Sequence, residues 1–501
     1  MELIDNLMLG LQTALSLQNL FFAFIGCLMG TLIGVLPGVG PLATIAMLLP
    51  FTFGLDPTSA LIMLAGIYYG GAYGGSTTAI LLNVPGETSS VVTVIDGYQM
   101  ARQGRAGVAI CTAAISSFFA GCVGTLILAA FAGSLTVLAL RFGPADYFSL
   151  MAVGLVGAIS LTSGSTIKAI GMVLIGIILG LVGTDIQTGA LRFVFGQQYL
   201  WDGINVIAIA IGIFAFGEAV GGMEGDGKGQ TYTDRIGSIF PTRADCVRMI
   251  GPILRGTTIG SLLGVLPGAG QSVSSFIAYS VDKKVSRYRK EFGSGAIEGV
   301  AAPEAANNAA AQTAFVPTLT LGVPGSATMA MMLGAMIMHN IQPGPRVMVS
   351  NPDLFWGLIV SMWIGNLILV ILNLPLVGLW VKLLQIPYKL LFFAIVMFSC
   401  FGVFAANNAI FDLLLAAGFG LAGYLLRWLD CEPAPLLLGF ILGPIMEDNF
   451  RRALVMSDGD YSVFVTEPIS SVFLILSALF LALTLIPAFR RKRDEVAIDE
   501  S

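Results

Sequence analysis

Long uncharged hydrophobic stretches dominate the chain, and they predict membrane-spanning helices. No charged side chain lies between Asp5 and Asp56, and the stretches from Leu354 to Val381 and from Leu390 to Phe411 are equally free of charge. Each reaches or exceeds the roughly 20 residues that cross a bilayer as an α-helix. Further apolar runs begin near Ala106, Ala145, Thr166, Gly203 and Pro468. We therefore expect an all-α polytopic membrane protein with about ten to fourteen membrane segments.

The glycine and proline pattern of the first half recurs in the second half. GCLMGTLIGVLPGVG spans Gly26 to Gly40, and GTTIGSLLGVLPGAG spans Gly256 to Gly270, a constant offset of 230 residues. LLNVPG, which ends at Gly86, has a counterpart in TLGVPG, which ends at Gly325. We predict two internal repeats, with a first half at 1–222, a polar central loop at 223–248, a second half at 249–466 and a final helix with a basic tail at 467–501.

The Pro-Gly steps predict helix breaks at membrane depth. Proline removes a backbone donor and disfavours helix before it, while glycine admits positive φ. Backbone left without partners in hydrocarbon costs several kcal/mol per group, so it survives only where it is buried in protein or lines a watery cavity. Four such steps, at 37–38, 85–86, 267–268 and 324–325, therefore predict re-entrant or broken hairpins around a binding site rather than simple kinks.

Positive charges flank both ends of the second LPGAG segment. Arginines precede it, and Lys283, Lys284, Arg287, Arg289 and Lys290 follow it. Because basic residues mark the cytoplasmic side, this segment is expected to enter the membrane, turn and return. The basic run at 490–493 likewise places the C-terminus in the cytoplasm. Acidic rather than basic residues precede the first copy, which favours an inverted over a parallel arrangement of the repeats.

Polar residues inside otherwise apolar sequence supply the candidate ligands. Hydroxyl, amide and carboxylate oxygens suit a small cation, and the proposed cation ligands are Ser76, Thr77, Thr78, Asn307, Asn308 and Glu304. Backbone amides at helix N-termini suit an anionic substrate, and the proposed substrate contacts are Gly38, Gly40, Asn83, Gly86, Gly268, Gly270, Ser272 and Gly325. Glu87 is a further carboxylate beside a break that could bind a cation or a proton. The competing interpretations are helix packing, interhelical hydrogen bonds, a bare hinge and, for Glu304, a structural salt bridge.

Composition and motifs exclude several other classes of function. The net charge of −5 offers no basic face for nucleic acid, and six scattered Cys with a single His give neither a disulfide framework nor a Cys/His zinc site. GMEGDGK at 222–228 has Walker A spacing, but Gly229 stands where Ser or Thr should bind Mg²⁺. We expect no enzyme activity, no cofactor and no metal beyond Na⁺.

Five sequence blocks together resemble the large membrane subunit of the tripartite tricarboxylate transporters, the TctA family. They are GVLPGVG, GGSTTAILLNVPGE, GVLPGAGQ, AAPEAANNAAAQTAFVPTLTLGVPGS and ILGPIMEDNFRRAL. The resemblance runs from about Leu20 to Ser471. It implies a bacterial inner-membrane permease that works with a small four-helix membrane subunit (TctB-like) and a periplasmic solute-binding protein (TctC-like). It also implies citrate-like di- or tricarboxylate substrates and an ion gradient, usually of Na⁺.

The expected function is therefore a cation-coupled (Na⁺ or H⁺) carboxylate symporter that works by alternating access. A passive anion channel is the alternative, because glycine-rich re-entrant loops also build pores. A membrane enzyme acting on a lipid carrier is a third class, for which the sequence offers no nucleophile or metal cluster.

Overall fold

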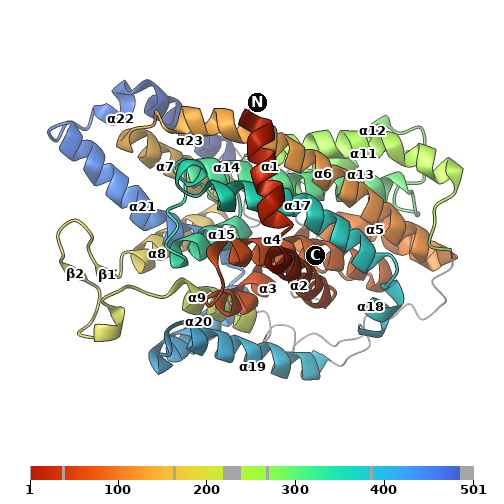
Figure 1. Cartoon of the computed structure of the whole chain (residues 1–501), viewed down its shortest axis with the longest axis horizontal. Helices are drawn as coiled ribbons and strands as arrows, with labels where there is room; N and C mark the ends of the chain where they lie inside the picture. The colour runs from red at the N-terminus through yellow and green to blue at the C-terminus, as the bar shows by residue number, and fades with distance from the viewer. Residues whose placement is uncertain are drawn as a thin grey trace.

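A computed structural model describes residues 2–36, 40–161, 165–217, 220, 238–266, 270–383 and 388–485 (Figure 1). The chain is 79% helical. Within the described ranges, the strands are limited to one antiparallel pair, β1 (Gly183–Thr184) and β2 (Leu191–Arg192). The prediction of an all-α membrane protein is confirmed at this level.

The helices of the first half, in chain order, are α1 (Glu2–Ala14), α2 (Leu17–Gly34), α3 (Pro41–Leu48), η1 (Leu49–Thr52), α4 (Pro57–Leu82), η2 (Thr88–Ser90), α5 (Val91–Met100), η3 (Ala101–Arg105), α6 (Ala106–Ala139), α7 (Pro144–Leu161), α8 (Thr166–Gly180), η4 (Gln198–Leu200), α9 (Val206–Ala210) and η5 (Ile211–Phe216). Those of the second half are α11 (Arg243–Gly264), α12 (Gly270–Val285), α13 (Glu298–Thr313), α14 (Phe315–Leu321), α15 (Ala327–Met338), α16 (Val347–Ser350), α17 (Pro352–Asn373), α18 (Val377–Leu383), α19 (Tyr388–Asn407), α20 (Ile410–Trp428), α21 (Ala434–Met456), α22 (Val463–Thr466) and α23 (Pro468–Leu485). Helix α11 begins inside the polar interval that the sequence suggested as a central loop.

Several of these helices are apolar enough to lie in a bilayer. Among the described residues, four helical stretches are both long and apolar enough to cross a membrane: Leu17–Gly34, Thr88–Ala139, Pro352–Asn373 and Ile410–Trp428. Seven shorter apolar helices accompany them. Helices that stop short of a full crossing are expected where hairpins enter the membrane and return.

Glycines allow two pairs of helices to pack with their backbones in contact. In the pair α2–α4, a Cβ at Gly26, Gly30 or Gly34 would lie 2.2, 2.4 or 2.5 Å from the carbonyl oxygens of Met63, Ile67 and Gly71. In the pair α11–α13, a Cβ at Gly256, Gly260 or Gly264 would lie 2.3, 2.2 or 2.5 Å from those of Ala302, Ala306 and Ala310. Both pairs are parallel, because residue numbers rise together along the contact. The partner residues differ by 239 between the halves, as do Gly86 and Gly325.

The two helix pairs run in opposite directions. The Tyr68 ring on α4 lies 6.1 Å from the ring of Phe315, the first residue of α14, which directly follows α13. Further along α4, the Ser76 hydroxyl donates to Glu304 near the start of α13 at 2.9 Å. Residue numbers therefore rise along α4 as they fall along its neighbour, so the first pair is antiparallel to the second.

Each helix that precedes a Pro-Gly step ends there. Helices α2, α4, α11 and α14 stop at Gly34, Leu82, Gly264 and Leu321. Residues 37–39 and 267–269, which include two of the four Pro-Gly steps, lie outside the described residues. After the third break the chain returns alongside α11, because Arg255 of α11 forms an ion pair with Asp282 near the end of α12. Within the described residues, the helices thus end before all four steps, and α11 and α12 form a hairpin.

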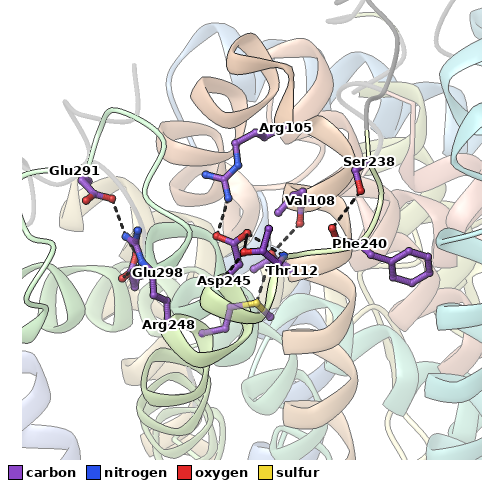
Figure 2. Close-up of polar contacts among 11 residues, drawn as sticks. Arg105, Val108, Thr112, Ser238, Phe240, Asp245, Arg248, Glu291 and Glu298 are labelled. Carbon is purple, nitrogen blue, oxygen red and sulfur yellow. Dashed lines mark hydrogen bonds and ion pairs between the residues drawn. The ribbon is translucent and has the colours of Figure 1, made fainter.

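Figure 2 shows one ion pair between the two halves and two ion pairs within the second half, near the start of α11. Arg105, at the end of η3, lies 2.8 Å from Asp245 of α11. Arg248, one turn further along α11, pairs with Glu298 and Glu291 at 2.8 and 2.7 Å. Nearby, buried Asp96 of α5 accepts hydrogen bonds from the Tyr279 hydroxyl and from the backbone amides of residues 293, 295 and 296. First-half residues thus fix the loop between α12 and α13.

The glycine contacts lead to a stability prediction. Gly30→Ala and Gly260→Ala should each lower the thermal stability of the detergent-solubilised protein, because overpacking a tight contact typically costs about 1–3 kcal/mol and here the obstacle is backbone. Stability would be read as the midpoint of loss of the monodisperse peak in size-exclusion chromatography after heating. Gly171→Ala on α8 is the matched control, because its Cβ would meet no atom within 4 Å. Equal midpoints for all three variants would contradict the prediction.

Candidate functional site

The two breaks of the first half lie together. Asn83 ends α4 in the left-handed conformation at φ 59°, and the chain then folds back along the helix. A Cβ at Gly86 would lie 2.4 Å from the Cα of Gly75 and 3.1 Å from the carbonyl oxygen of Gly34. The second break of this half therefore packs against the end of α2, where the first break begins, and only glycine fits there.

The second half repeats this arrangement with a looser contact. Gly322 ends α14 in the left-handed conformation at φ 72°. A Cβ at Gly325 would lie 3.7 Å from the carbonyl oxygen of Gly264, at the end of α11. Each half therefore brings one helix end and one Pro-Gly loop to the same place.

Besides these contacts within each half, a cluster of polar side chains joins the two halves at the breaks. We call Tyr68, Glu87, Thr88, Gln271, Ser272 and Asn307 the junction cluster. The Tyr68 hydroxyl donates to Gln271 at 2.9 Å, and the Gln271 amide donates to Asn307 at 2.7 Å. The Asn307 amide reaches Glu87 at 3.4 Å, and the Thr88 and Ser272 hydroxyls are 2.9 Å apart. The cluster thus connects the second break of one half to the first break of the other.

Part of the junction cluster lies at the surface of the protein. The Thr88–Ser272 contact is exposed, whereas Tyr68 is 1% exposed and Asn307 is also 1% exposed. On the reciprocal side, α3, which starts directly after Gly40, packs against α15, which starts directly after Ser326. Helix α3 has no side-chain cap at Gly40. Hydroxyls and amides therefore gather at the junction cluster, and a second contact between the halves is made by α3 and α15.

A second group of polar residues surrounds Glu304, and we call it the Glu304 cluster. The Glu304 carboxylate is 1% exposed and accepts hydrogen bonds from Thr93 at 2.6 Å, Ser76 at 2.9 Å and Ser117 at 3.3 Å. Asn308 supports the cluster from one turn along α13, because its amide donates to Ser117 at 2.6 Å. The side chains come from α4, α5, α6 and α13, so both halves build the site.

A small cavity lies beside this carboxylate. Its volume is about 10 Å³, close to the minimum for one water molecule. The polar residues that line it are Tyr73, Ser76, Thr77, Ser117, Glu304 and Asn373. The Tyr73 hydroxyl and the Asn373 side-chain oxygen are buried with no hydrogen-bond partner. Buried polar atoms without partners are costly, so the cavity has spare capacity to bind a small polar or charged species.

The described residues place no basic side chain in an ion pair with Glu87 or Glu304. The structural salt bridge considered for Glu304 is therefore not formed within that part of the chain. A carboxylate in hydrocarbon surroundings requires a proton, a cation or several hydrogen-bond donors. Hydroxyl and amide groups are what surround both of these carboxylates.

The structure divides the residues proposed from sequence between these sites. Ser76, Thr77, Asn308 and Glu304 belong to the Glu304 cluster, whereas Asn307 and Ser272 belong to the junction cluster. The Thr78 hydroxyl instead donates to the carbonyl oxygen of Val35 at 2.7 Å, at the end of α2. Gly40, Gly86, Gly270 and Gly325 lie at the breaks, Asn83 is exposed at the end of α4, and Gly38 and Gly268 lie outside the described residues.

Sequence reasoning missed several members of the two clusters. Gln271 directly follows the LPGAG segment, so sequence could have marked it as a candidate. Thr93, Ser117 and Asn373 lie in helices outside the repeated blocks, where a single hydroxyl or amide looks like ordinary helix packing. They become recognisable only when the fold brings them to Glu304.

A larger cavity lies at the β1–β2 hairpin, at the opposite end of the molecule from α11 and α12 (Figure 1). Its volume is about 360 Å³, and its charged lining consists of Arg192, Arg451, Asp185, Asp202, Glu447 and Asp448. The hydrogen bond from Thr188, with the guanidinium groups of Arg451 and Arg192, holds the pKa of Asp185 well below its usual range. Four acidic groups against two arginines leave a negative lining, which disfavours an anionic ligand.

Comparison with known proteins agrees with the resemblance found in the sequence. The family described as the tripartite tricarboxylate transporter TctA family matches residues 20–438. An uncharacterized 52.8 kDa protein of Agrobacterium vitis, named for the TAR-I ttuC' 3' region, is 54% identical over 500 residues, which is 100% of both chains. An uncharacterized protein in the TAR-II ttuC' 3' region of the same organism is 56% identical over 241 residues, which is 48% of this chain and 100% of the relative. No solved structure matches the chain.

The family match covers the glycine-packed helix pairs, the four breaks and both polar clusters. Together with the apolar helices, it identifies a multi-pass membrane protein of a transporter family. The chain belongs to the tripartite tricarboxylate transporter TctA family.

Proposed function

We propose that the chain is the permease subunit of a binding-protein-dependent secondary transporter, which imports di- and tricarboxylates by cation symport. The observation that carries the proposal is the junction cluster, where broken helices from both halves meet within a family of tricarboxylate transporters. Binding sites of secondary transporters characteristically lie between discontinuous helices of two related halves.

The substrate is proposed to bind at the junctions between the halves. Its carboxylates would meet the hydroxyls of Thr88 and Ser272 and the uncapped start of α3. A helix N-terminus carries about half a positive charge, so such sites bind anions without many basic side chains. Helix N-termini and hydroxyls can therefore bind citrate-like anions, although basic side chains are scarce in the apolar helices.

Alternating access is proposed to arise from two inverted repeats. The supporting observations are the matching glycine contacts of the two helix pairs and their opposite directions. In related arrangements, one unit moves against the other so that a fixed site opens to either side. The contacts of Asp96 and Arg105 with the second half are of the kind that would have to break when the site opens on that side.

We propose an orientation in a bacterial inner membrane from charge and helix direction. The Lys and Arg residues after α12 support a cytoplasmic position for that end. Arg105 lies at the same end, so in this orientation α6 would leave the cytoplasm and α7 would return toward it. Helix α23 is parallel to α7, since Ser149 contacts Ser470 at 2.6 Å and Ser160 contacts Phe480 at 3.4 Å. A cytoplasmic C-terminus is therefore proposed, although the basic run at 490–493 lies outside the described residues.

The proposed partners follow from family membership. They are a small four-helix membrane subunit, TctB-like, and a periplasmic solute-binding protein, TctC-like, which would deliver the carboxylate.

Uptake measurements test this function. Proteoliposomes containing both membrane subunits should accumulate a radiolabelled di- or tricarboxylate only when the binding protein and an inward Na⁺ or H⁺ gradient are both present. A carboxylate panel identifies the substrate. Saturable counterflow separates a carrier from the alternative, a passive anion channel. Uptake that required ATP, or that ran without the binding protein, would exclude the proposed mechanism.

Gln271 gives a test of the junction cluster. Gln271→Leu removes the hydrogen bonds to Tyr68 and Asn307 that join the halves, so uptake should fall by roughly tenfold or more while membrane insertion is unchanged. Gln18→Leu is the control, because Gln18 bonds Ser59 at 3.2 Å in a different part of the first half. Initial uptake rates at equal protein density provide the measurement. Equal rates for both variants would place the substrate elsewhere.

A further inference from the structure

The cavity beside Glu304 combines one carboxylate with a set of neutral oxygens. Oxygen-bearing side chains lining it come from Tyr73, Ser76, Thr77, Ser117, Glu304 and Asn373. Tyr73 is 5% exposed and Asn373 is 2% exposed, and neither the Tyr73 hydroxyl nor the Asn373 side-chain oxygen has a hydrogen-bond partner. Three hydroxyl donors already reach Glu304, so the two free oxygens are not needed to satisfy it. They are available for another occupant.

The identity of the occupant follows from charge and size. A single carboxylate among neutral oxygens has a charge of −1, which one monovalent cation would neutralise. Oxygen ligands suit hard alkali and alkaline-earth cations, but a divalent ion would leave an excess positive charge in a low-dielectric site. A volume of about 10 Å³ is the space of one water molecule at most. Na⁺ is smaller than water, whereas K⁺ is about as large.

Other residues can also adapt to a cation. Ser76 lies within hydrogen-bond distance of its own backbone, at 3.1 Å from the Ala72 carbonyl oxygen, as well as of Glu304. Its proton can therefore turn to Ala72 and leave a lone pair for the ion. Ser117 receives a hydrogen bond from Asn308, which fixes the Ser117 oxygen in place. Asn373 donates its amide to Leu369 at 2.9 Å, which directs its oxygen away from that carbonyl.

We propose that this cavity is a Na⁺ site formed by Glu304 with Ser76, Ser117, Asn373 and Tyr73. The proposal rests on the proposed symport function for its role as the coupling-ion site, but the binding of Na⁺ itself can be measured without transport. It names Na⁺ rather than H⁺ as the ion, and it assigns Ser117, Asn373 and Tyr73, which lie outside the ligands expected from sequence.

Na⁺-dependent stabilisation of the purified protein tests the site. NaCl should raise the thermal midpoint of the wild type in a saturable manner, while KCl and choline chloride at equal ionic strength should not. Glu304→Gln should abolish the Na⁺-dependent shift. Ser117→Ala and Asn373→Ala should each weaken the apparent Na⁺ affinity by roughly 10- to 100-fold, the effect of removing one neutral ligand from a charge.

Matched control variants lie on the same helices. Ser116→Ala is the control for Ser117→Ala, and Asn366→Ala is the control for Asn373→Ala, because each control residue is buried with an unpartnered oxygen but does not line the cavity. Tyr69→Phe and Tyr73→Phe form a third pair on α4. The controls should keep wild-type Na⁺ affinity. This comparison separates loss of the ion from a general loss of stability.

The outcomes distinguish the site from the transport mechanism. Absence of any Na⁺ effect on the wild type, or a Na⁺ effect that Glu304→Gln retains, would overturn the site. A stabilisation that follows pH and ignores Na⁺ would also overturn it, in favour of a proton on Glu304. If Na⁺ stabilises the wild type through Glu304 while uptake ignores the Na⁺ gradient, the site stands and the proposed Na⁺ symport fails.

Discussion

The constraint on which the structure depends is that backbone amides and carbonyls cannot be left without partners in a hydrocarbon environment. Every Pro-Gly break frees several of these groups. In the first half, direct contacts bury or satisfy these groups. The Gly86 loop packs onto the end of α2, and Thr78 donates a hydrogen bond to the Val35 carbonyl oxygen. Such contacts require helices whose backbones nearly touch, which is why glycines follow one face of α2 and of α11. Close glycine packing therefore allows the ends of the broken helices to be buried in protein.

The ends of the helices before the Pro-Gly steps could be predicted from sequence because proline and glycine act locally. The ends of α2, α4, α11 and α14 follow from chemistry within a few residues of each Pro-Gly step. The return of α12 alongside α11 followed from the position of charges, which also acts on single segments. The division of the polar residues between the junction cluster and the Glu304 cluster could not be predicted from sequence. Asn307 and Asn308 are neighbours in the chain, yet they point to Gln271 and Ser117 in different clusters.

Residues such as Thr93, Ser117 and Asn373 illustrate why the rest was hidden. Each is a single polar side chain in an apolar helix, and most such residues bond their own helix backbone or a neighbouring helix. Asn373 itself bonds Leu369 through its amide, and its proposed role as a ligand rests on its unpartnered side-chain oxygen. Whether such a side chain is a packing residue or a ligand depends on which groups the other helices bring next to it, and this depends on the tertiary structure.

Helix α13 connects the two polar clusters in a way that bears on coupling. Asn307 faces the junction cluster, and Glu304 and Asn308 face the cavity, so one rigid helix carries contacts to both. Helix α4 does the same with Tyr68 and Ser76. Because α4 and α13 belong to different halves, a relative movement of the halves would alter both clusters together. If the proposed ion stabilises one arrangement of Glu304, it would also bias the junction cluster, as coupling between two sites requires.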